Sequence, residues 1–111
     1  MRDSDQEIKA RLRELGVRWL AGSDAGWRAT PFDTFWKELD ELVTIGMSPV
    51  EAIRAATGAV AEALHISDWY GTVQAGRTAD MVIVAGNAAS DIRCVANAQA
   101  VFQAGRCLHF D

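Results

Sequence analysis

Residues 17–26 decide the fold of this chain, and they run Val-Arg-Trp-Leu-Ala-Gly-Ser-Asp-Ala-Gly. The first five residues form a short, mostly apolar run, as expected of a strand that is buried on both faces. The next five place a polar tip, centred on Asp24, between two glycines. Because glycine tolerates backbone conformations that other residues avoid, Gly22 and Gly26 let the chain turn sharply and approach another group closely. The segment therefore predicts a buried strand that ends in a tight loop carrying a carboxylate.

One helix is predicted before this strand. Ser4 and Glu7 have the spacing of a capping box, in which both side chains satisfy unpaired backbone amides at a helix start. Gly16 is well placed to end the helix. A narrow apolar stripe at helical spacing lies between these signals and consists of Ile8, Leu12 and Leu15.

Two further helices are predicted after the strand. The second helix starts at residues 30–33, where a proline occupies the first helical position, and it stops at Gly46. Its apolar side chains form a wide stripe that needs a large partner surface. They are Phe32, Phe35, Trp36, Leu39, Leu42 and Val43. Ser48 and Pro49 open the third helix, in which Gly58 costs about 1 kcal/mol relative to alanine. Close packing against a neighbour would explain that glycine.

After His65 the helical period gives way to short apolar runs separated by turns. Four strands are predicted, at residues 70–73, 81–84, 98–102 and 107–110. The last two form a hairpin with a glycine-containing loop. The predicted order is therefore helix, strand, helix, helix and four short strands, which is an α/β chain.

Composition excludes several classes of function. The net charge is -4 and no basic stripe is present, so nucleic-acid binding has little support. No apolar run approaches the roughly 20 residues that a membrane span needs. No secretory signal is recognised at the start, and Cys94 and Cys107 are too few for a disulfide framework. We therefore expect a cytoplasmic protein in which both cysteines are buried free thiols.

The chain is an unusual candidate for a free-standing domain. It has 111 residues, whereas a (β/α)₈ barrel needs about 250. The strand at residues 17–21 has no parallel partner in the sequence, and the first helix is too narrow to cover the second. We therefore expect it to associate with a larger chain or with another copy of itself.

Several segments together resemble the C-terminal end of the amidohydrolase superfamily, in particular imidazolonepropionase-like and Xaa-Pro-dipeptidase-like enzymes. Their order and spacing extend over nearly the whole chain. The segments are residues 22–26, 38–49, 51–58, 71–76, 79–84, 86–87, 91–92, 101–102 and 105–106. The resemblance implies that residues 1–66 are the last strand and helices of a (β/α)₈ barrel. It implies that residues 67–111 are strands of the β-sandwich that accompanies the barrel.

The same resemblance assigns a role to Asp24. It matches the aspartate at the end of the eighth barrel strand, which contacts the catalytic metal and handles the proton of the attacking water. From their place in the loop, Trp27 and Arg28 either line the substrate pocket or pack the loop. On Asp24 alone, the alternative is a turn aspartate that caps the next segment.

This chain lacks the histidines of the family's metal site. The family uses a His-x-His pair and two later histidines, whereas His65 and His109 match neither position. One carboxylate cannot hold a catalytic zinc, which needs about three protein ligands. The resemblance therefore implies a divalent metal, zinc, in the complete enzyme, and we expect none in this chain alone.

Two functions from different classes remain open. The first is part of a C–N hydrolase that is active only with the missing barrel portion. The second is a non-catalytic α/β module, derived from such an enzyme, that forms a homo-oligomer.

Overall fold

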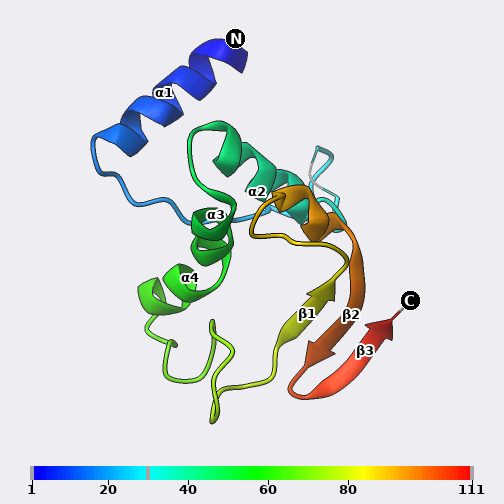
Figure 1. The fold of residues 1–111 in the computed structure, drawn as a ribbon. Helices are drawn as coiled ribbons and strands as arrows, with labels where there is room; N and C mark the ends of the chain where they lie inside the picture. Colours follow the sequence, from blue (N-terminus) through cyan, green and yellow to red (C-terminus); the bar gives the residue numbers. More distant parts are fainter. Residues whose placement is uncertain (1, 30, 111) are drawn as a thin grey trace.

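The computed structural model describes residues 2–29 and 31–110, with side chains for residues 4–29 and 31–108. The helices gather on one side and a small sheet lies on the other (Figure 1). The elements in chain order are α1 (Arg2–Glu14), α2 (Phe35–Thr44), α3 (Pro49–Ala56), α4 (Gly58–Ala63), β1 (Met81–Val84), the 3₁₀ helix η1 (Ile92–Ala96), β2 (Ala98–Gln103) and β3 (Arg106–Phe110). The chain is thus a small α/β structure with a three-stranded antiparallel sheet.

A small core lies where α2, α3 and η1 meet. Leu39 and Leu42 from the apolar stripe of α2 are buried there against Ala52 and Ala55 of α3. Ile92 of η1 closes the cluster, which places the loop after β1 over the helices. The predicted wide stripe thus finds its partners in α3 and η1 rather than in α1.

The predicted third helix is divided into α3 and α4. Ser48 begins α3 as expected, because its side chain accepts a hydrogen bond of 3.1 Å from the Glu51 backbone N–H. The helix ends at Thr57, whose φ of -129° and ψ of -93° are not helical. Gly58 is therefore the first residue of α4, not a helix-interior glycine. The predicted neighbour exists, since the Gly71 carbonyl oxygen lies 3.8 Å from where a Cβ of Gly58 would be.

The sheet has the order β1-β2-β3, and both neighbouring pairs are antiparallel. Ala104 and Gly105 join β2 to β3 with positive φ values of 50° and 82°, the conformation favoured in two-residue hairpins. Asp80 supports this turn, because its carboxylate accepts a 2.8 Å hydrogen bond from the Ala104 backbone N–H. The strand at residues 81–84 and the hairpin are confirmed.

β1 is poorly covered. It lies at the edge of the sheet, and Met81, Val82 and Ile83 are all exposed. Val82 and Ile83, which point to opposite faces of the strand, are 52% and 53% exposed. Neither face of this strand is therefore fully covered by the described residues.

The two other predicted strands do not form. Residues 17–21 are irregular in the structure, and one backbone hydrogen bond, from Ala21 N–H to the Ala55 carbonyl at 3.0 Å, ties them to α3. A strand needs a neighbouring strand, and the described residues offer none here. Residues 70–72 form bends and residue 73 is irregular, because Gly71, with φ of 101°, packs its backbone against α4 instead of pairing.

Three smaller predictions are also wrong. Ser4 lies inside α1, which already includes Arg2, so Ser4 is not its N-cap. The second helix begins at Phe35, after Thr34, and Phe32 is 83% exposed outside it; Thr30 lies outside the described residues. Cys107 lies on β3, an edge strand of the sheet, and is exposed, not buried.

Within the part of the chain that the structure describes, no helix is long and apolar enough to cross a membrane.

Candidate active-site loop

Asp24 occupies the tip of the loop that follows residues 17–21. Its φ is 49°, in the left-handed region that aspartate tolerates better than most residues. The Ser23 hydroxyl accepts a 3.1 Å hydrogen bond from the Ala25 backbone N–H and so closes the turn around the aspartate. The Asp24 side chain is exposed. The predicted tight tip with an accessible carboxylate is therefore present.

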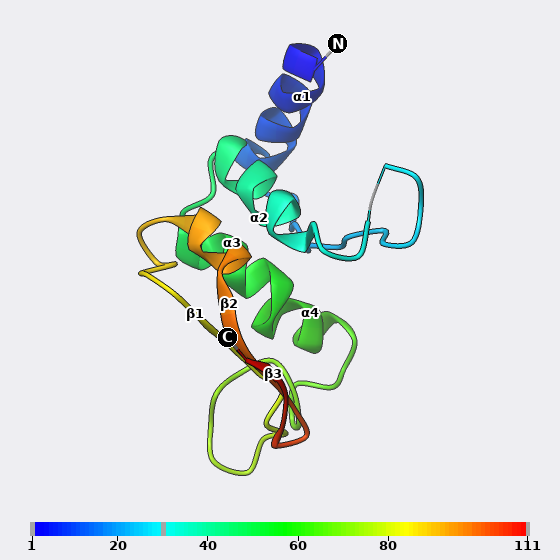
Figure 2. The same cartoon turned by 90° about the vertical axis from the view of Figure 1, so that its right-hand side faces the viewer.

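The loop continues away from the body of the molecule, as the cyan segment at the right of Figure 2 shows. Trp27 is 68% exposed, and Arg28 is exposed beside it. Gly26 has a φ of 100°, and the Phe32 ring lies 3.3 Å from where its Cβ would be. The ring thus rests against the glycine, which a larger residue would prevent. The loop presents an acid, an aromatic ring and a guanidinium to solvent.

The described residues do not fit a complete metal centre. No group of three or more His, Cys, Asp or Glu side chains comes together among them. His65 follows α4 with a φ of 59° and is exposed, and the His109 side chain lies outside the described set. A catalytic zinc takes about three protein ligands. The Asp24 carboxylate alone therefore cannot form such a centre with the other described residues.

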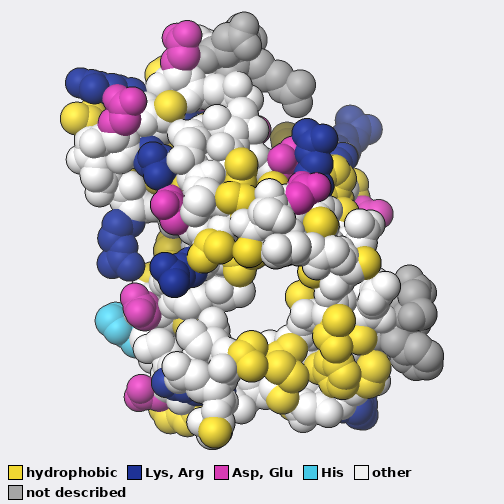
Figure 3. All heavy atoms as spheres, viewed as in Figure 1, with side chains coloured by type: hydrophobic (Ala, Val, Ile, Leu, Met, Phe, Trp, Pro, Cys, Tyr) yellow, Lys and Arg dark blue, Asp and Glu magenta, His cyan; other side chains and the backbone are white. Residues whose placement is uncertain are grey.

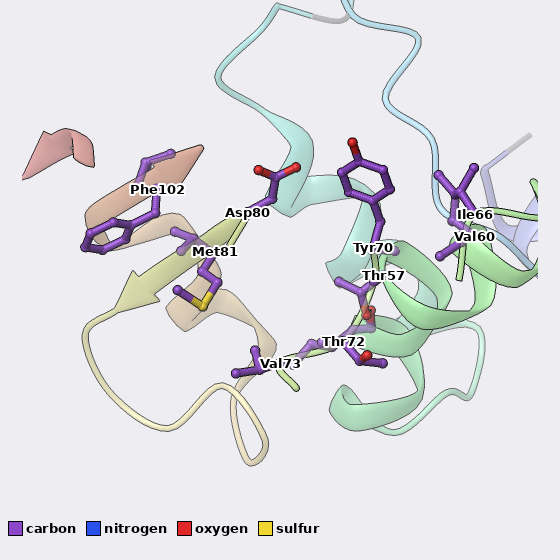
Figure 4. Close-up of a pocket in the computed structure, with 15 residues that line it drawn as sticks. Thr57, Val60, Ile66, Tyr70, Thr72, Val73, Asp80, Met81 and Phe102 are labelled. Carbon is purple, nitrogen blue, oxygen red and sulfur yellow. The ribbon is translucent and has the colours of Figure 1, made fainter. Parts of the chain in front are cut away.

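A second feature, which sequence reasoning did not find, is an apolar groove between the helices and the sheet. Its volume is about 820 Å³. Figure 4 shows Thr57 and Val60 on the helical side and Met81 and Phe102 on the sheet side. Figure 3 shows the hollow, with hydrophobic side chains along the sheet. Asp80 lines the groove, but its carboxylate supports the hairpin turn, so we assign the groove no chemistry.

A smaller pocket of about 450 Å³ lies beside the hairpin turn and is lined by Tyr70, Thr78, Asp80, Gln103, Ala104 and Arg106. Neither hollow includes Asp24. The acidic tip and the two hollows are therefore separate features. No local pattern in the sequence indicated the groove, because its lining comes from segments that lie far apart along the chain.

Comparisons with known proteins agree on one family. The family model described as "Amidohydrolase family" matches residues 4–107. No curated protein matches the chain. Among solved structures, a Xaa-Pro dipeptidase with bound methionine in its active site is 32% identical, with a TM-score of 0.86 over 96% of this chain and 25% of that one.

Two further structures extend the comparison. A prolidase-like protein from Bifidobacterium longum is 31% identical, with a TM-score of 0.82 over 89% of this chain and 25% of its own. Phenylurea hydrolase B is 40% identical over 66% of this chain and 16% of its own, with a TM-score of 0.63. The chain thus spans about a quarter of the length of the first solved structures that it matches. The family model matches residues 4–107, and two of the solved structures have more than 30% sequence identity to this chain. These findings show that this chain belongs to the amidohydrolase family.

Proposed function

We propose that this chain is the C-terminal part of a metal-dependent amidohydrolase that cleaves C–N bonds, and that it is incomplete on its own. In this proposal, residues 1–66 are the last strand and helices of the barrel, and residues 67–111 are strands of the accompanying sandwich. The observation that carries the proposal is the position of Asp24. It lies at a glycine-flanked tip, shortly after the irregular segment 17–21, inside a family match over residues 4–107.

Asp24 is suited to proton transfer because its side chain is accessible and its backbone is held by the Ser23–Ala25 turn. A carboxylate in reach of a water molecule can accept its proton and return it to a leaving nitrogen. In the complete enzyme Asp24 would also contribute one carboxylate toward the metal. Trp27 and Arg28, four residues or fewer further along an exposed loop, are the proposed substrate contacts.

The surface of the chain supports incompleteness. Its accessible area is 8028 Å², whereas a folded monomer of 12.1 kDa is expected to expose about 6,000 Å². This excess of accessible area favours a further layer of protein against this chain. The enclosed indole N–H of Trp19, in the irregular segment 17–21, has no hydrogen-bond acceptor among the described residues. Because buried donors normally have a partner, the packing around Trp19 is expected to rearrange in the complete protein.

The test supplies the complementary portion of a family member to this chain. The chain is co-expressed with the complementary three quarters of the homologous Xaa-Pro dipeptidase, and hydrolysis of dipeptides is assayed with added Zn²⁺. We expect activity from the pair and none from either part alone. Asp24→Asn should lower kcat by about 10²–10⁴-fold, whereas Asp68→Asn, at an exposed site, should leave it unchanged. A pair that associates and hydrolyses equally well with Asp24→Asn would overturn the role of Asp24.

A second candidate is a non-catalytic module that associates with itself, and the exposed apolar groove and β1 favour it. Native mass spectrometry separates the two. A metal-free oligomer of the purified chain that persists when the complementary portion is added would support the module. A monomer that binds the complementary portion and a metal would support the hydrolase.

A further inference from the structure

Helix α1 docks on the body by its polar face. The side chains of Gln6, Lys9, Ala10 and Arg13 lie on one face of the helix and are half-buried. Most of the apolar stripe points the other way: Ile8 and Leu15 are 60% and 65% exposed, and Leu12 between them is 37% exposed. This is the reverse of the usual surface helix, whose apolar stripe faces the core. Apolar burial therefore contributes little to holding α1 in place.

Ion pairs provide the contacts between α1 and the body. The Lys9 ammonium lies 3.5 Å from a carboxylate oxygen of Glu41 on α2. The Arg13 guanidinium lies 3.0 Å from a carboxylate oxygen of Glu51 on α3 and also covers Gly46, whose hypothetical Cβ would be 3.5 Å away. Among the described side chains of α1, two further ion pairs, Lys9–Asp5 and Arg11–Glu14, lie within the helix and cannot hold it to the body.

Such contacts respond to salt. The side chains of the two bridging pairs are between 31% and 52% exposed, so dissolved ions reach them. Ala10, which packs partly against the core, is a small apolar contact that salt does not weaken. A helix of this length is only marginally stable when isolated in water. Releasing α1 should therefore also unfold it.

We propose that α1 is held by an electrostatic latch, the pairs Lys9–Glu41 and Arg13–Glu51, so that ionic strength determines whether the helix is docked and folded. The latch also bears on the candidate loop. Between α1 and Asp24, the chain is tied to α3 by the hydrogen bond from Ala21 to Ala55. Glu51 and Ala55 are on the same helix, so α3 holds both α1 and the approach to the aspartate.

Hydrogen exchange of the full chain, followed by mass spectrometry, tests the latch. Peptides from α1 are compared with peptides from α2 at low salt and in 1 M NaCl, where the screening length falls to about 3 Å. We expect exchange of the α1 amides to rise about tenfold at high salt, and exchange of the α2 amides to stay nearly constant. The double variant Glu41→Gln/Glu51→Gln should exchange rapidly in α1 at both salt concentrations. It leaves the α1 sequence, and so its intrinsic exchange rates, unchanged.

Glu38→Gln is the matched control, because Glu38 lies on α2 and no ion pair joins it to α1 among the described residues. It should behave like the unmodified chain. The proposal is overturned if α1 exchange is independent of salt, or if the double variant matches Glu38→Gln. Protection of α1 that persists in the double variant would show that Ala10 and other apolar contacts hold the helix.

Discussion

Gly71 lies so close to Ala61 on α4 that a Cβ on the glycine would come within 2.6 Å of the Ala61 Cβ. The Thr57 carbonyl oxygen would be 3.1 Å away, and the φ of Gly71 is 101°. Backbone and helix therefore meet without room for any side chain. This contact ends the helical half of the chain and directs it toward the sheet.

Gly71→Ala should destabilise the chain by about 2–4 kcal/mol, because overpacking adds to the cost of a left-handed backbone for alanine. Gly76 separates the two effects, since its φ is 88° but nothing lies within 4 Å of its Cβ position. Gly76→Ala should therefore cost only about 1 kcal/mol. Urea unfolding measures both. Equal losses of unfolding free energy in the two variants would show that the chain around Ala61 can accommodate the added methyl group at little cost.

The hairpin depends on Asp80. Asp80→Ala removes the acceptor for the Ala104 N–H and should cost about 1–2 kcal/mol in the free energy of unfolding. Asp80→Asn keeps an acceptor oxygen and should recover much of that loss. Thermal unfolding provides the measurement, and Asp68→Ala, at an exposed position, should change stability by no more than about 0.5 kcal/mol. If asparagine were as damaging as alanine, the negative charge rather than the hydrogen bond would be what matters.

The N-caps of α2 and α3 should differ in energetic importance. The Ser48 hydroxyl accepts from the Glu51 N–H, whereas the Thr34 side chain makes no capping hydrogen bond. Ser48→Ala should destabilise the chain by about 1 kcal/mol. Thr34→Ala, which loses an exposed bond to the Pro31 carbonyl, should cost less. Denaturant unfolding of the two variants compares them, and the reverse order would contradict this account of α3.

Stability of α1 should also depend on pH in the alkaline range. The hydrogen bond to Asp5, with smaller contributions from the charges of Asp5 and Glu41, raises the pKa of Lys9 above its ordinary value of 10.5. A raised pKa in the folded state means that the stabilisation is complete below the ordinary pKa and is lost as pH rises through the raised one. Helical circular dichroism should therefore fall in that window. The Lys9→Met variant should have a weaker helical signal at neutral pH and should show no fall of that signal in the alkaline range. If the fall were unchanged in this variant, another group would be responsible for it.

Elements with local signals were predictable from the sequence. The Ser48-Pro49 start specifies α3 through one hydrogen bond and one fixed backbone angle. The β-branched residues predict β1, and the turn with Gly105 predicts the hairpin of β2 and β3. Asp24 was located as an exposed tip in the same way, because glycines on both sides specify a turn.

Elements that depend on distant partners were not predictable. Residues 17–21 have the composition of a buried strand, but the described chain supplies no neighbour to pair with them. Residues 70–72 form bends because Gly71 is packed on α4, a contact between positions that no local pattern connects. The position of α1 was missed for a third reason: its apolar stripe predicted burial, whereas the ion pairs of the opposite face hold it.

The open edge of β1 bears on how the chain behaves at high concentration. Residues 81–84 contain no charge and no proline, and their outward backbone N–H and C=O groups can pair with a strand of any neighbouring molecule. We therefore expect the purified chain to aggregate through this strand at high concentration, under conditions in which its helical core is still folded. Ile83→Lys should therefore raise solubility without raising the melting temperature. In a cell, the same exposed edge would make this chain a substrate for chaperones.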